Sequence, residues 1–157
     1  MWVGDVETTN DAQRLAALDV PVSQLLSDGM CHLEAKLVHT ALCDLPVEDM
    51  DLVFVENVGN MVCPAESDIG EHGKIAVMSV TEGEDKPLKY PLLFREAIAV
   101  IITKTDLLPH LDFDLPACLA NVVKVNGDIP VFQTSGRSGE GVEAVVDWLS
   151  EAMVAPA

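Results

Sequence analysis

The chain has 157 residues, of which 49% are hydrophobic, so it is long and apolar enough for one compact domain with a sizeable core. Its 9 Lys and Arg against 26 Asp and Glu give a formal net charge of -17, which repels phosphate backbones and excludes nucleic acid as an expected partner. There is no secretory signal and no apolar run near the roughly 18 residues of a membrane helix, so we expect a cytoplasmic protein that does not associate with membranes.

Apolar runs and helical patterns alternate through the first part of the chain. Three strands are predicted there: Met1–Asp5, Val22–Leu26 and Leu52–Val55. Two helices lie between them: Asp11–Leu18 and Cys31–Leu42. The third strand is apolar throughout, so we expect it to be buried on both faces of a parallel sheet. The second helix places Cys31 and His32 in its first turn.

The same alternation continues to the end of the chain. Three further strands are predicted, at Lys74–Val80, Ile98–Ile102 and Ile129–Phe132. A short helix ends over Phe94–Ala97, and two longer helices cover Pro116–Val125 and Gly141–Ala152. Strands that alternate with helices form βαβ units, so the predicted fold class is α/β, a mostly parallel sheet flanked by helices.

The stretch Asp51–Pro64, DLVFVENVGNMVCP, carries the most chemical information. Glu56 follows the last apolar residue of a strand, at the sheet edge where open α/β folds bind their ligands. Asn57, Gly59 and Asn60 form a turn, which Cys63-Pro64 closes. A carboxylate, a turn and a thiol in one short segment indicate a site where a nucleotide switch and a soft metal communicate. The alternative is an ordinary exit from a strand into a loop.

Cys31, His32 and Cys63 are the candidate metal ligands. Thiolate and imidazole suit nickel, zinc or copper rather than magnesium or calcium, and a helix N-terminus lowers the pKa of a cysteine. Together they supply three ligands, one fewer than a tetrahedral zinc site has, and a two-fold dimer that pairs two such sites would complete the shell. The alternative is that the cysteines are buried as small hydrophobes beside a surface histidine.

The other cysteines and histidines are expected to have no part in chemistry, with one exception. Cys43 and Cys118 lie among apolar helix residues, so we expect both to pack as small hydrophobes. His72 and His110 are expected to be solvated. His39, on the same predicted helix as Cys31, is a spare metal ligand.

A second set of polar residues follows the later strands. Thr103-Lys104-Thr105-Asp106 comes after one strand, and Ser135–Gly141, SGRSGEG, comes after the next. A carboxylate at such a place can accept the N1 and N2 hydrogens of guanine, which adenine cannot match, so Asp106 would select the base. Lys104 would pack along the base, and backbone amides near Ser135 would meet the guanine oxygen.

Four segments together closely resemble the HypB family of GTPases and nickel metallochaperones, which act in [NiFe]-hydrogenase maturation: GDVETTNDA, ENVGNMVCP, TEGEDKPLKYP and TKTDLLPHLDFD. The resemblance runs from the first residues to about Trp148. The urease accessory GTPase shares the general plan, but the first two segments are closer to the hydrogenase family.

The resemblance implies a P-loop GTPase-like domain that acts in GTP-dependent nickel insertion. The implied catalytic residues, near magnesium and the γ-phosphate, are Asp5 and Glu56. The implied nucleotide-binding residues are Asn57, Gly59, Lys104, Asp106 and Ser135. Cys31, His32 and Cys63 are implied to bind nickel or zinc at a dimer interface. The implied partners are GTP, the hydrogenase large subunit, other maturation proteins and a second copy of the chain in a metal- or nucleotide-linked homodimer.

Two features depart from the family's pattern. The strand, GxxGxGK[ST] loop and helix that precede GDVETTNDA in the family do not occur in this sequence, so we expect a single domain over residues 1–157 that is N-terminally incomplete. We therefore expect the chain alone to hydrolyse GTP at no more than background rate. Thr103 stands where guanine-binding motifs have asparagine, which should weaken base recognition. A non-catalytic nickel or zinc module, or an inactive fragment, is the alternative function.

Overall fold

The computed structural model of the chain describes residues 2–5, 15, 18, 21–26 and 29–154. The chain divides into two compact units, residues 1–71 and 72–157. The predicted helix over Asp11–Leu18 lies outside the described residues except for Leu15 and Leu18. No helix within the described ranges has the length and apolar character needed to cross a membrane. The expectation of a single domain stays a prediction.

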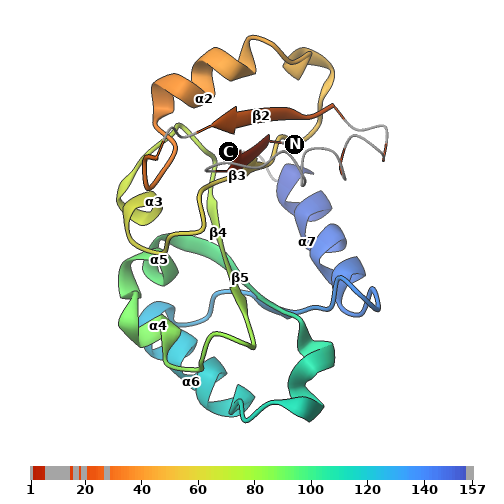
Figure 1. Ribbon diagram of the computed structural model, residues 1–157. Coiled ribbons are helices and arrows are strands. Elements are labelled where there is room, and N and C mark those ends of the chain that lie inside the picture. The colour runs from red at the N-terminus through yellow and green to blue at the C-terminus, as the bar shows by residue number, and fades with distance from the viewer. Residues whose placement is uncertain (1, 6–14, 16–17, 19–20, 27–28, 155–157) are drawn as a thin grey trace. The chain divides into compact units, whose positions relative to one another are not determined.

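A three-stranded parallel sheet forms the centre of the first unit. Its strands are β1 (Trp2–Asp5), β2 (Ser23–Leu26) and β3 (Val55–Glu56), in the order β2-β1-β3. Helix α2 (Ala35–Leu42) packs against β2 (Figure 1). The short helices η1 (Val47–Asp49) and α3 (Cys63–Glu66) complete the unit. The core is made by Leu25, Leu33, Val38 and Ala41, with partly buried Leu37, Leu42, Leu45, Val55 and Ile69 around them.

Two predictions for this unit are wrong. Helix α2 begins at Ala35, so Cys31 and His32 lie in the loop before it and not in its first turn. The reason is tertiary: the N–H group of buried Leu33 donates to the side chain of Asn57, which draws the segment out of helical geometry.

The predicted buried strand at 52–55 is the second wrong prediction. Strand β3 has two residues, Val55 and Glu56, because β1 pairs with it only at Trp2 and Val3. Leu52 and Phe54 are 39% and 41% exposed, so this run is not buried on both faces. Glu56 nevertheless ends the strand, as predicted.

The second unit contains another three-stranded parallel sheet, in the order β4-β5-β6. Its strands are β4 (Lys74–Ser79), β5 (Ala97–Thr103) and β6 (Val131–Gln133). Its helices are α4 (Lys86–Lys89), α5 (Pro91–Glu96), η2 (Thr105–His110), α6 (Leu115–Asn126) and α7 (Val142–Val154). The strands and helices predicted for this part are therefore present, and α4 forms within the segment TEGEDKPLK.

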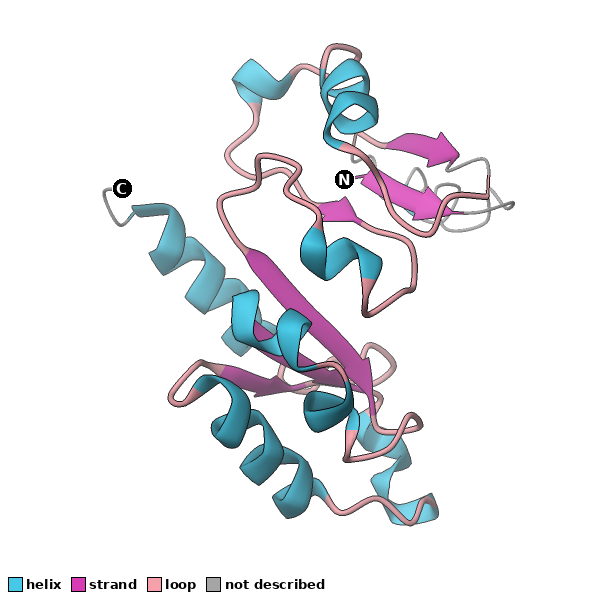
Figure 2. Ribbon diagram, turned by 90° about the vertical axis from the view of Figure 1, so that its left-hand side faces the viewer, coloured by secondary structure: helices cyan, strands magenta, loops and turns pink. Residues whose placement is uncertain are grey.

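Helices cover both faces of this second sheet (Figure 2). On one face, the Cys118 thiol of α6 contacts the sulfur of Met78 at 3.9 Å, beside Ile102. On the other face, Phe132 meets Trp148 of α7 with ring centroids 5.6 Å apart. Side chains alternate between the faces of a strand, so α6 and α7 lie on opposite faces. The prediction of a parallel sheet flanked by helices is confirmed.

Asn126 connects the end of α6 to the start of β5. Its side-chain amide donates to the carbonyl oxygens of Phe94 at 2.7 Å, Arg95 at 3.1 Å and Ala97 at 3.0 Å. These carbonyls stand where α5 ends and β5 begins, so they lack a complete set of helix or sheet partners. The side chain of Asn126 therefore supplies hydrogen bonds to the carbonyl oxygens at the junction between α5 and the central strand β5.

We predict that Asn126→Ala lowers the free energy of unfolding by about 1–3 kcal/mol, because it leaves these carbonyl oxygens without a donor. Asn126→Asp should lower it at least as much, since its carboxylate oxygens would face three carbonyl oxygens. Urea unfolding followed by circular dichroism measures both, with exposed Asp128→Ala as the control. An Asn126→Asp variant as stable as the native chain would contradict this role.

Candidate functional site

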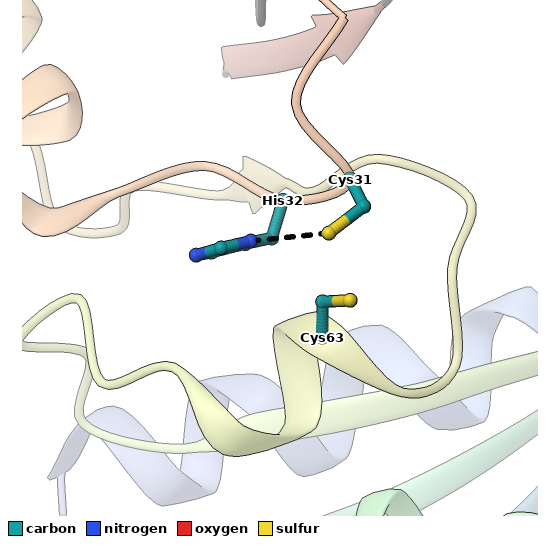
Figure 3. Close-up of side chains that lie close together, drawn as sticks. All are labelled: Cys31, His32 and Cys63. Carbon is teal, nitrogen blue, oxygen red and sulfur yellow. Dashed lines mark hydrogen bonds between the residues drawn. The ribbon is translucent and has the colours of Figure 1, made fainter.

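Cys31, His32 and Cys63 come together in the first unit. Their ligand atoms all lie within 4.8 Å of one another, and no other group of this kind with three or more members occurs among the described residues. Cys31 Sγ lies 3.5 Å from His32 Nδ1, and Cys63 stands on α3 facing them (Figure 3). Cys31 is exposed, while His32 and Cys63 are half-buried. The three side chains form a cluster that solvent can reach, which we call the thiol–imidazole cluster.

Two asparagines hold the segments that carry this cluster. Asn57 Oδ1 accepts from the N–H groups of Leu33 and Val58, both at 2.9 Å. Asn60 Oδ1 accepts from Val62 N at 2.8 Å and from Cys63 N at 3.4 Å. From the sequence, Asn57 and Asn60 are predicted as turn residues and Asn57 also as a nucleotide-binding residue, and these backbone contacts are not predicted. The contacts of Asn60 have a signal in the sequence. Asparagine side chains often accept from backbone N–H groups two and three residues further along the chain, which here belong to Val62 and Cys63.

The two thiols of the cluster differ in acidity. Hydrogen bonds with the Cys63 thiol and with His32 lower the pKa of Cys31. The pKa of Cys63 is raised, first because its hydrogen is held by the Cys31 sulfur and then by burial. Cys31 is therefore the first thiolate to form. Binding of a metal to both sulfurs must release the proton of Cys63, so it should strengthen as the pH rises.

The cluster fits a thiophilic transition metal. Two ligands about 2.3 Å from a tetrahedral ion lie about 3.8 Å apart, so atoms already within 4.8 Å need only small side-chain movements to bind one ion. Thiolate and imidazole donors suit nickel and zinc, and the group offers no oxygen ligand that magnesium or calcium would prefer. With three protein ligands, a fourth position stays open to solvent or to another donor.

The remaining cysteines and histidines lie outside the cluster. Cys118 is fully buried as predicted, and burial together with the nearby Glu84 carboxylate raises the pKa of its thiol to about 11. Cys43 is exposed, so its predicted role as a buried hydrophobe is wrong. The reason is its place just after the last residue of α2, where its thiol donates to the His39 carbonyl at 3.4 Å. His39, His72 and His110 are also exposed.

In the second unit, Asp106 and Ser135 meet directly. Ser135 is fully buried, and its hydroxyl donates to Asp106 Oδ1 at 2.6 Å. The same hydroxyl oxygen accepts from the N–H groups of Arg137 at 3.3 Å and Ser138 at 3.2 Å. Thr105 N also donates to Thr134 O at 3.1 Å, which joins the two loops through the backbone. The structure thus brings together two residues that the sequence analysis placed in one site.

Lys104 and Thr103 lie at the edge of this arrangement. Lys104 is exposed and has a φ of 61°, a left-handed conformation that reverses the chain after β5. The hydroxyl of Thr103 donates to the Met78 carbonyl at 3.2 Å, so it serves the sheet. Gly141, with a φ of 70°, closes the loop over Ser135; a Cβ there would collide with the Gln133 carbonyl oxygen.

The two carboxylates implied to act near phosphate stand on neighbouring strands. Asp5 is the last residue of β1 and Glu56 the last of β3, and the two strands pair in parallel with Val3 opposite Glu56. The side chain of Asp5 lies outside the described part of the structure, and Glu56 is exposed. Gly59 is exposed too, in the loop that follows β3.

A family model for the CobW/HypB/UreG nucleotide-binding domain matches residues 2–133. The chain belongs to this family. It is 51% identical over 146 residues to the hydrogenase maturation factor HypB of Azotobacter vinelandii, covering 93% of this chain and 48% of that protein. It therefore spans about half the length of the curated relatives it matches.

Two solved structures of this family share the fold. The crystal structure of HypB from Helicobacter pylori in complex with nickel aligns with a TM-score of 0.91 at 35% identity, covering 97% of this chain and 73% of that one. The structure of the hydrogenase maturation factor HypB from Archaeoglobus fulgidus aligns with a TM-score of 0.88 at 30% identity, covering 97% and 74%. The resemblance to the HypB family seen in the sequence is thereby confirmed.

We predict that, in the metal-free chain near neutral pH, iodoacetamide alkylates Cys31 faster than Cys118, because the lowered pKa of Cys31 gives more thiolate and the thiol of Cys118 is buried. His32→Ala should slow the reaction of Cys31 by removing one of the groups that lower its pKa. Peptide mass spectrometry over time measures each cysteine. Alkylation of Cys118 before Cys31 in the folded chain would contradict the assignment.

Proposed function

We propose that this chain binds nickel at the thiol–imidazole cluster, as part of a GTP-dependent factor that inserts nickel into [NiFe]-hydrogenase. The observation that carries the proposal is the convergence of Cys31, His32 and Cys63 within 4.8 Å, in a member of this family. The nickel complex of the Helicobacter pylori relative supports the choice of metal. Zinc suits the same donors and is the competing ion.

An incomplete ligand set suits cargo better than a permanent structural metal. Structural zinc sites are closed by four protein ligands, whereas this cluster offers three and includes an exposed thiol. The open position lets a receiving protein or a second chain add a ligand before the ion leaves. A homodimer linked by the metal or by nucleotide is the assembly that we propose for the bound state.

The nucleotide part of the proposal rests on the second unit. Asp106, oriented by Ser135, would accept the N1 and N2 hydrogens of guanine, while the exposed Lys104 would pack its stem along the base. Asn57 and Gly59 would shape the loop beside the phosphates.

For hydrolysis, Asp5 and Glu56 would lie near the γ-phosphate and its magnesium, and would orient the attacking water. Magnesium, when bound, would supply charge stabilisation to the transferred group.

A second candidate function is metal binding without catalysis. The thiol–imidazole cluster and the asparagines that hold it lie within residues 31–63 and include none of the guanine residues of the second unit. A storage or docking module could therefore use the cluster alone. Guanosine nucleotide binding by the purified chain that is lost in Asp106→Ala favours the first function, and its absence favours the second.

We place this function in the cytoplasm, with the hydrogenase large subunit and other maturation proteins as partners. The relatives are named as hydrogenase maturation factors, which supports a role in hydrogenase maturation. The four free cysteines support a reducing compartment. The acidic surface, with a net charge of -17, would favour basic protein surfaces as partners.

We predict that Cys63→Ala abolishes nickel binding that survives competition from a weak chelator, because it leaves only two protein ligands. Cys43→Ala is the matched control, since Cys43 is an exposed thiol outside the cluster. Equilibrium dialysis measures binding, and light scattering with and without nickel measures self-association. If Cys63→Ala binds nickel as tightly as the native chain and shows the same change in mass in solution when nickel is added, the metal site lies elsewhere in the chain.

We predict that Asp106→Asn weakens guanosine nucleotide binding by about tenfold or more, because the asparagine amide presents hydrogens where guanine also presents hydrogens. Xanthosine nucleotides, which offer an oxygen there, should gain affinity. Isothermal titration of both nucleotides against the native chain and the variant gives the comparison. Unchanged preference for guanosine in the variant would exclude Asp106 as the base-selecting residue.

A further inference from the structure

The loop after β3 contains two asparagines that contact the two halves of the thiol–imidazole cluster in different ways. Asn57 reaches across to the segment that carries Cys31 and His32, through the Leu33 N–H group at 2.9 Å. Asn60 reaches the other half, through the Cys63 N–H group at 3.4 Å and the Cys63 sulfur at 3.6 Å. Both side chains are half-buried.

The chemistry of the two asparagines differs. Asn57 uses only its carbonyl oxygen in these contacts, as an acceptor for the N–H groups of Leu33 and Val58. Asn60 uses both ends: its oxygen accepts from the backbone, while its Nδ2 group donates to the Cys63 sulfur. An N–H donor draws electron density from the sulfur that accepts it, so this contact would adjust the donor strength of Cys63 toward a bound metal.

We infer that Asn60 is a positioning residue for the metal ligand Cys63 and tunes its sulfur by hydrogen bonding, while Asn57 fixes the Cys31–His32 segment opposite it. This inference rests on the proposed nickel site. Partners of this kind orient metal ligands and adjust their donor strength, and their loss commonly weakens metal binding by about 10–100-fold. The loop that follows β3 thus builds the metal site through its amide side chains as well as through its cysteine.

This assignment also connects the metal to the strand end that carries Glu56. Asn57 is the next residue after Glu56, and its oxygen is shared between the loop's own Val58 and the distant Leu33. The residue that holds the segment with His32 is therefore the direct neighbour of the residue that ends β3.

The test uses nickel added to the purified full-length chain, with two readouts: affinity in chelator competition and the energy of the thiolate-to-nickel charge-transfer band in the near ultraviolet. Asn60→Ala should weaken binding by about 10–100-fold and shift the band to lower energy, because an unbonded sulfur gives up its electron density more easily. Asn57→Ala should weaken binding without moving the band, since Asn57 contacts backbone and not a ligand atom.

Two aspartate variants separate positioning from a general loss of structure. Asn57→Asp keeps the acceptor for Leu33 and Val58, so it should restore nickel affinity to within a fewfold of the native chain. Asn60→Asp keeps the acceptor for the backbone but loses the donor to sulfur, so the band should shift to lower energy in the folded chain.

The results also separate this inference from the proposed function. If Cys63→Ala leaves nickel binding intact, the proposed site itself is wrong. If Cys63→Ala abolishes binding while both Asn60 variants keep the native affinity and band energy, the site stands and the role of Asn60 is overturned. A band shift in Asn57→Ala equal to that in Asn60→Ala would likewise overturn it, because the effect would not come from the contact with sulfur.

Discussion

The hydrogen bond from Leu33 N to Asn57 Oδ1 is the contact on which the thiol–imidazole cluster depends. It joins two segments that are 24 residues apart, one leading into α2 and one leaving β3. Because Leu33 is fully buried in the core of the first unit, this contact cannot shift without disturbing Val38 and Ala41 as well. Core packing therefore fixes the backbone beside His32. The buried side chain of Leu33 in this way determines where the thiol–imidazole cluster lies.

In both units, polar side chains accept from backbone N–H groups of the loops at the carboxyl ends of the strands. Loop N–H groups beyond a parallel sheet lose their ladder partners, and short polar side chains supply the missing acceptors. Asn57 and Asn60 do this in the first unit, and Ser135 does it in the second, where its hydroxyl also donates to Asp106. In each unit, a side chain that accepts from loop N–H groups also contacts a reactive side chain. Asn60 contacts the thiol of Cys63 in the first unit, and Ser135 contacts the carboxylate of Asp106 in the second.

Acidity and exposure divide the cysteines by role. A hydrogen bond between the thiols of Cys31 and Cys63 lowers the pKa of Cys31 and raises that of Cys63, so Cys31 is the first of the two to lose its proton. Cys118 lies against Met78 with its pKa raised to about 11, and it stays a protonated part of the core. A metal bound as proposed would meet the exposed, more acidic Cys31 sulfur first and the half-buried Cys63 sulfur second, an order that would suit transfer better than permanent retention.

The sequence alone determined the order of strands and helices in the second unit, the pairing of Asp106 with Ser135 and the choice of Cys31, His32 and Cys63 as one group of candidate ligands, because apolar runs, turn residues and soft donors are local signals. It did not determine where α2 begins, how short β3 is or which cysteines are exposed. The start of α2 depends on the contact between the distant residues Asn57 and Leu33, and the length of β3 depends on the two pairs that it makes with β1. Cys43 is exposed because the helix ends at the residue before it. Helical spacing continues through Cys31 and His32, yet one long-range hydrogen bond and a buried leucine outweigh local preference, and only tertiary structure reveals that balance.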